Sequence, residues 1–352
     1  MMKGRLGYKA ANLLCYLSLS YFSLAGCAPN NSPASLPSVE TPSYTIEESK
    51  TSGTGPSIDG EFRQILDEYI KLNARLERIA ARLKSANADL CDNIEADIGV
   101  STHTVYDYPP ELRSAARHFF KVGPDLSRRT VRTDSPAYAA GLRAGDKIIR
   151  INTQSLTETP PFTDPALSGI IADAQFHEQL DKLVQQNKSA ELEYKRENKS
   201  STVTLTPRAQ CQLPVTLFFS ENVNGHYING EIWMTSGLLR EVKEDAEVAY
   251  ILAHEMAHAL TDKGDYETAK RTAKIELEAD RVGLILLARA GYDPSKLARF
   301  WAKQIDIFDG GEISSDTHPD LDQRAHNYAL TLSYIQAAQN DDKALMSLIT
   351  AP

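Results

Sequence analysis

The sequence predicts an α+β protein in which a mainly helical domain with a small sheet is interrupted by a β-rich domain. Residues 61–88, 243–264 and 267–292 repeat apolar side chains at the spacing of amphipathic helices. Between them, residues 134–205 combine glycine turns with alternating apolar residues, and 190–205 indicates a hairpin. The 352 residues suffice for two domains. A net charge of −9 argues against nucleic acid as a main partner.

The first 26 residues have the pattern of a secretory signal. Lys3, Arg5 and Lys9 precede an apolar run over residues 10–25, which is short for a membrane span; a retained anchor helix is the alternative. The run ends in Leu24-Ala25-Gly26-Cys27, which resembles the bacterial lipobox. The resemblance implies removal of residues 1–26 and lipidation of Cys27. With Ala28 next, it implies an anchor in the outer membrane, facing the periplasm.

Residues 27–60 are rich in Pro, Ser, Thr and Gly and contain few apolar side chains, which predicts a flexible tether. If the signal is removed and Cys27 carries lipid, Cys91 and Cys211 are the remaining cysteines. Two thiols in an oxidising periplasm most simply form a disulfide, although two separately buried thiols are the alternative.

The β-rich region resembles a bacterial PDZ domain. It carries SPA at 135–137, AGL at 140–142 and AGD at 144–146, followed by an apolar strand, and the resemblance spans residues 112–208. PDZ domains bind an extended peptide as an added strand, so a peptide ligand is a possible partner. A PDZ-shaped spacer without a ligand is the other interpretation.

A candidate metal site lies in the segment AHEMAHAL at 253–260. His254 and His258 are four residues apart, so both project from one side of the predicted helix. Zn²⁺ binds imidazole nitrogen readily, and a catalytic site needs a third protein ligand and an open position. Glu255 is placed to reach a water molecule at the metal. A histidine on an apolar helix is more often a core residue, but this spacing and order are specific for zinc.

The third ligand is expected from the helix at 267–292. Glu276 and Asp280 share one face of that helix, whereas Glu278 points almost oppositely, toward solvent. One residue of the pair can bind the metal while the other orients a ligating histidine.

Together, HEMAH and Glu276-Leu277-Glu278-Ala279-Asp280 resemble the HExxH and ExxAD motifs of the HtpX-like zinc metallopeptidases, which are gluzincins. The resemblance implies one Zn²⁺ per chain, held by His254, His258 and Glu276, with Glu255 as the catalytic base and Asp280 behind a ligand. It further implies a substrate-binding edge strand at Glu231, Ile232, Trp233, Met234 and Thr235, with Gly230 at the preceding turn. His318 and Arg324 match an HPxxxxR element expected near the zinc, and a fourth ligand from His318 would give a latent site.

The predicted organisation is therefore a peptidase domain at 61–106 and 209–338, the PDZ-like insert at 112–208 and a C-terminal tail at 339–352. The expected function is a membrane-anchored periplasmic zinc endopeptidase acting on envelope or misfolded proteins. A chaperone or assembly factor for envelope proteins, with little or no turnover, is the rival, and a structural zinc protein is a second one.

Overall fold

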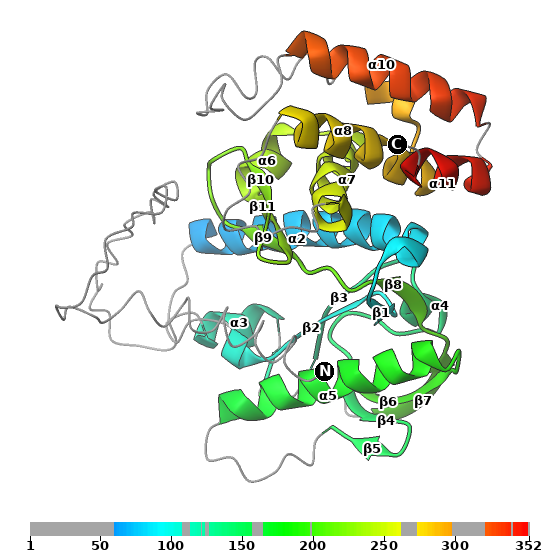
Figure 1. Ribbon diagram of the computed structural model, residues 1–352. Coiled ribbons are helices and arrows are strands. Elements are labelled where there is room, and N and C mark those ends of the chain that lie inside the picture. Colours follow the sequence, from blue (N-terminus) through cyan, green and yellow to red (C-terminus); the bar gives the residue numbers. More distant parts are fainter. Residues whose placement is uncertain are drawn as a thin grey trace, which may run out of the picture.

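A long helix, α2 (Gly60–Ala86), belongs to a helical unit and lies between the other helices of that unit and a β-rich unit (Figure 1). The structure is a computed structural model that describes residues 60–107, 113–120, 122–123, 127–156, 165–197, 199–261, 273–297, 321–338 and 341–350. The predicted signal, the tether before residue 60, Cys27 and His318 lie outside these residues. Within them, no helix combines the length and the apolar character needed to cross a membrane.

The helical unit consists of α2 and η1 (Ala88–Leu90), which precede the β-rich insert, and of the elements that follow the insert. The latter are, in chain order, β9 (Val215–Phe218), β10 (Gly225–Ile228), β11 (Glu231–Thr235), α6 (Ser236–Glu241), α7 (Asp245–Thr261), α8 (Ala273–Arg289), η4 (Pro294–Leu297), α10 (Leu321–Ala337) and α11 (Asp342–Thr350). The predicted helices at 61–88, 243–264 and 267–292 are thus confirmed as α2, α7 and α8, with somewhat different ends.

The two central helices of this unit, α7 and α8, pack closely because a glycine lies at their contact. A Cβ atom at Gly283 would lie 2.9 Å from the backbone nitrogen of His254. Three alanines with small side chains are also buried, namely Ala253 and Ala257 on α7 and Ala279 on α8. Small side chains therefore bring the backbone that carries the histidines against the helix that carries Glu276.

The small sheet has the strand order β10-β11-β9. β10 and β11 form a hairpin whose turn is Asn229-Gly230, with φ of 51° and 84°, values that suit a two-residue turn. β11 pairs antiparallel with β10 on one side and parallel with β9 on the other. The prediction that 231–235 is the edge strand is wrong, because its backbone bonds to both neighbours. The edge strands of this sheet are β10 and β9.

The β-rich unit is built on a sheet with the order β2-β3-β4-β6-β7, to which β5 adds beside β4. Its elements are β1 (Ile94–Asp97), β2 (Val100–His103), η2 (Val105–Asp107), α3 (Arg113–Phe120), β3 (Ser127–Val131), α4 (Pro136–Ala139), β4 (Lys147–Ile151), β5 (Gln154–Ser155), α5 (Pro165–Gln185), β6 (Ala190–Arg196), β7 (Lys199–Leu205) and β8 (Arg208–Cys211). The hairpin predicted at 190–205 is confirmed as β6 and β7. Phe176 and Leu180 of α5 are buried in the core beneath the sheet.

The boundary of the insert differs from the predicted one. β2, placed by sequence in the peptidase segment 61–106, pairs antiparallel with β3 of the β-rich unit. Ala96 and Ile98 are buried in the core of that unit. The insert therefore begins near Ile94, because a strand that precedes the recognisable motif completes the sheet.

The C-terminal segment also differs from the prediction of a tail. Residues 342–350 form α11, whose Leu345 is buried in the core of the helical unit. Arg289 of α8 forms an ion pair with Asp342 in the first turn of α11, with 2.8 Å between Nε and Oδ1. Nine residues are too few for a periodic pattern to distinguish a short helix from a tail.

The base of the insert is clamped where the chain leaves and re-enters the helical unit. Cys91 and Cys211 are disulfide-bonded with their Cα atoms 5.5 Å apart, as predicted. Next to them, β1 pairs antiparallel with β8, and Ile94 lies opposite Cys211.

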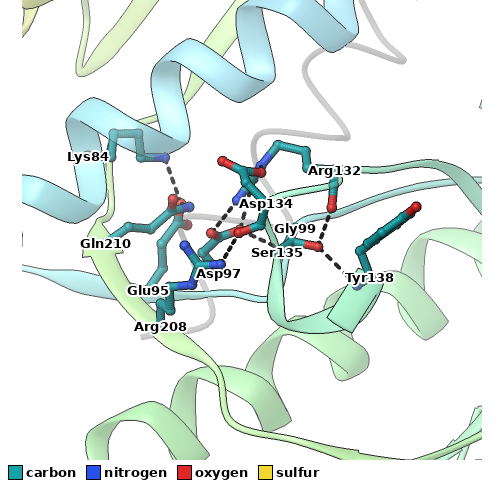
Figure 2. Close-up of polar contacts among 10 residues, drawn as sticks. All are labelled: Lys84, Glu95, Asp97, Gly99, Arg132, Asp134, Ser135, Tyr138, Arg208 and Gln210. Carbon is teal, nitrogen blue, oxygen red and sulfur yellow. Dashed lines mark hydrogen bonds and ion pairs between the residues drawn. The ribbon is translucent and has the colours of Figure 1, made fainter. Parts of the chain in front are cut away.

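Polar contacts extend this clamp to α2 and to the sheet (Figure 2). Lys84 of α2 forms a largely buried ion pair with Glu95 at 2.8 Å, and Gln210 donates to the same carboxylate at 2.9 Å. Arg132 donates two hydrogen bonds to Asp97, at 3.0 and 2.6 Å. The disulfide and the ion pair between Lys84 and Glu95 thus join the two units, while the β1–β8 pair and the bonds from Arg132 to Asp97 stabilise the insert next to this junction.

Candidate metal centre

The two histidines of the HEMAH segment lie side by side in the interior of the helical unit. His258 is fully buried and His254 is 8% exposed. Their Nε2 atoms are 3.2 Å apart, and the rings are nearly perpendicular. The four-residue spacing on α7 therefore aims both Nε2 atoms at one point, as predicted from the helical period.

Glu276 of α8 completes the cluster. Its carboxylate oxygens lie 3.3 Å from His254 Nε2 and 3.6 Å from His258 Nε2, and its side chain is 1% exposed. One ligand atom from each of the three residues lies within 4.8 Å of the others. Two imidazole nitrogens and one carboxylate oxygen are the donor set of many catalytic zinc sites. The cluster fits a metal ion on geometry and chemistry.

Glu278 points away from the cluster, as its helical phase predicts. Its carboxylate accepts hydrogen bonds from Arg281 at 2.8 and 2.6 Å, and its side chain is 40% exposed. Among the acidic candidates on α8, the tertiary structure therefore brings Glu276 to the two histidines and leaves Glu278 at the surface.

Asp280 lies behind His254. Its Oδ1 is 2.9 Å from His254 Nδ1 and also accepts a hydrogen bond from Tyr250 Oη at 2.9 Å. An Nδ1–H bonded to this carboxylate leaves Nε2 available for a metal. Burial lowers the pKa of His254, but the hydrogen bonds to Asp280 and Glu276 outweigh it and raise this pKa to about 9. This role of Asp280 is the one that the resemblance implies.

Arg324 of α10 acts through Asp280 rather than at the cluster. Its guanidinium donates to both oxygens of Asp280, at 2.8 and 2.6 Å. The assignment of Arg324 as a catalytic residue is therefore corrected: it is a positioning residue that holds the carboxylate behind His254. Burial raises the pKa of Asp280, but the charge of Arg324 and the hydrogen bonds from His254 and Arg324 together outweigh this effect and keep that pKa below its usual range.

Glu255 lies at the edge of the small sheet. Its side chain is buried, and its Oε2 accepts a hydrogen bond of 2.6 Å from the backbone nitrogen of Tyr227 in β10. Helix α7 thus carries the proposed base directly beneath the edge strand and next to the two histidines.

Two residues of this arrangement were missed by sequence reasoning. Tyr250 lies four residues before His254, on the same side of α7, so the helical period signals its place. Tyr227 contributes a backbone N–H to Glu255, and a backbone contact of this kind has no signature in side-chain identity.

Comparison with known proteins agrees with this geometry. Residues 219–273 and 268–329 match the profile of peptidase family M48, and residues 128–172 match that of the PDZ domain. The mitochondrial metalloendopeptidase OMA1 of Arabidopsis thaliana is 30% identical over 130 residues, which are 27% of this chain and 26% of that protein. The chain thus spans about a quarter of the length of this curated relative.

Solved structures of PDZ-containing proteins also match. The HtrA3 PDZ domain bound to a phage-derived ligand is 18% identical, with 33% of this chain and 89% of that chain covered and a TM-score of 0.22. The HtrA-type protease AlgW with a decapeptide is 18% identical, with 34% and 30% covered and a TM-score of 0.24.

The fold and the site have the organisation of a metallopeptidase interrupted by a PDZ domain. The helical unit carries the sequence pattern of peptidase family M48 and the β-rich insert carries that of the PDZ domain, so the resemblance of each part to its family is confirmed.

Proposed function

We propose that this chain is a zinc-dependent endopeptidase that hydrolyses peptide bonds of unfolded or misfolded envelope proteins. The observation that carries the proposal is the convergence of His254, His258 and Glu276, with Glu255 buried beside them and beneath the edge strand. The M48 match and the OMA1 relative support it. Because β10 is at the sheet edge, a substrate segment is proposed to add to it as a further strand.

A zinc ion held by the three ligands would supply a Lewis acid for the scissile carbonyl. Glu255 would accept a proton from the attacking water and deliver it to the leaving amine. Asp280, held by Arg324 and Tyr250, keeps His254 in the tautomer that presents Nε2. Burial of these groups excludes bulk water from the proton-transfer path.

Removal of the metal tests this proposal. Treating the full-length protein with a zinc chelator should abolish cleavage of unfolded casein, and one equivalent of Zn²⁺ should restore it, whereas Mg²⁺ should not, because it prefers oxygen ligands. Casein digestion is followed by gel electrophoresis and zinc content by mass spectrometry. Cleavage that continues in metal-free protein would rule out the metallopeptidase. A zinc-loaded protein that prevents aggregation without any cleavage would favour the chaperone alternative.

We further propose that lipid on Cys27 anchors the protein to the outer membrane, with support from the lipobox-like residues 24–27. Cys27→Ser removes the thiol that would carry the lipid, so the protein should leave the membrane fraction or keep its signal. Fractionation followed by intact mass measurement checks this result. An unchanged membrane fraction with a cleaved signal would show that the anchor is elsewhere.

A further inference from the structure

One face of the three-stranded sheet presents aromatic side chains to solvent. Trp233 on β11 is 39% exposed. The rings of Trp233 and Phe218 are in contact, with centroids 4.5 Å apart. His226 on β10 is also exposed. These three residues, His226, Phe218 and Trp233, are termed the outer aromatic face. Exposed aromatic groups of this size commonly mark binding surfaces.

The alternation of side chains along the strands separates this face from the core. Tyr227, Ile232 and Met234 are buried on the side that packs against the helices. His226 and Trp233 point the other way and are directly opposite each other in the antiparallel pair. They therefore form a cross-strand row that runs perpendicular to the strands.

This row leads to the proposed substrate position. β10 is the edge strand, and its Tyr227 contacts Glu255, so a peptide added along β10 passes beside the proposed base. The peptide residue opposite His226 then extends the row from Trp233 through His226. Neighbouring strands lie about 4.8 Å apart, which places Trp233 about 10 Å from that residue. An aromatic or long aliphatic side chain lying across His226 reaches toward Trp233, whereas alanine does not.

We propose that the outer aromatic face determines substrate specificity by selecting extended segments with an aromatic or large aliphatic residue opposite His226. This inference rests on the proposed peptidase function and names its substrate class. Large apolar side chains in strand-forming segments are buried once a protein is folded. The face therefore favours polypeptides that have not yet folded or assembled over folded proteins.

Paired peptides test the inference. Internally quenched peptides are prepared in pairs that have Phe or Ala at one position and are otherwise identical, with one pair for each position around the scissile bond. Cleavage of every pair is measured with the parent protein and with Trp233→Ala. The parent should prefer Phe at one position on the outer-face side. Trp233→Ala should lower kcat/KM for that Phe peptide by about 2–10-fold, the range for one aromatic pair, and leave the Ala peptide unchanged. Trp233→Phe should retain the preference.

Tyr334→Ala is the matched control, because Tyr334 is an aromatic residue 50% exposed on α10, outside the sheet. It should alter neither peptide. An equal loss for the Phe and Ala peptides in Trp233→Ala would overturn the inference, since it indicates a structural role. An unchanged preference would overturn it as well. Loss of vesicle binding or of self-association without a change in peptide preference would assign the face to a lipid surface or to a second copy.

Binding separates this inference from the proposed function. If the parent cleaves no peptide, the same pairs are titrated by fluorescence anisotropy against the full-length protein. Tighter binding of the Phe peptide that Trp233→Ala abolishes would uphold the inference while the peptidase function fails. Equal binding of both peptides, or none, would overturn the inference as well.

Discussion

Glu255→Gln should abolish peptide cleavage while the metal centre and the fold persist. The substitution keeps the size of the side chain but removes the carboxylate that accepts a proton from the attacking water. General acid–base catalysis contributes about 10²–10⁴-fold, so kcat should fall at least that far. The three ligands His254, His258 and Glu276 are untouched, so zinc content should stay at one per chain. Cleavage of a quenched peptide and zinc analysis of the same sample measure both quantities.

The hydrogen bond from Tyr227 makes this variant a sharp test. Its backbone N–H donates to Glu255 Oε2, and the amide oxygen of glutamine can accept the same bond. The edge strand should therefore keep its place, and substrate should still bind, as a stable complex in the variant. A rate equal to that of the parent, with zinc bound, would mean that Glu255 is not the proton acceptor.

Glu276→Gln should strip the centre of its metal. The carboxylate is 1% exposed and is the negatively charged member of the proposed ligand set, so glutamine leaves a weaker, uncharged oxygen. Loss of a residue that only hydrogen-bonds to a metal ligand typically lowers metal affinity by about 10–100-fold. Loss of the ligand Glu276 itself should lower the affinity for Zn²⁺ further. Titration against a competing chelator measures this affinity, and circular dichroism verifies that the helices remain.

Glu278→Gln is the matched control on the same helix. Its carboxylate contacts Arg281 at the surface, where an ion pair contributes about 0–1 kcal/mol to stability. Zinc affinity and activity should therefore be unchanged. If Glu278→Gln loses zinc and Glu276→Gln retains it, the ligand set proposed here is wrong.

The sequence predicted most of the metal centre, because its residues depend on local geometry. His254 and His258 share a side of α7, and Glu276 and Asp280 share a side of α8, because of the helical period alone. The contacts of Arg324 could not be predicted from the helical period. Its motif indicated proximity to the metal, but the structure directs its guanidinium to Asp280, a contact between residues 44 positions apart.

The sheets show the opposite situation. The hairpin at 190–205 was predicted because a short turn closes it, whereas only the strand at 231–235 and the turn at Gly230 were expected of the second hairpin. That β11 lies inside its sheet depends on its parallel pairing with β9. That β2 belongs to the β-rich unit depends on its pairing with β3, across the segment that carries α3.

By itself, the sequence determined the long helices α2, α7 and α8, their buried sides, the candidate metal-binding residues and the cysteine pair. Only the tertiary structure decided which strand is the edge, where the insert begins and that Tyr227 contacts Glu255. The physical reason is the range of the interactions. The phase of a helix is set by hydrogen bonds between residues four apart, whereas strand order depends on pairings between distant segments that only the folded chain brings together.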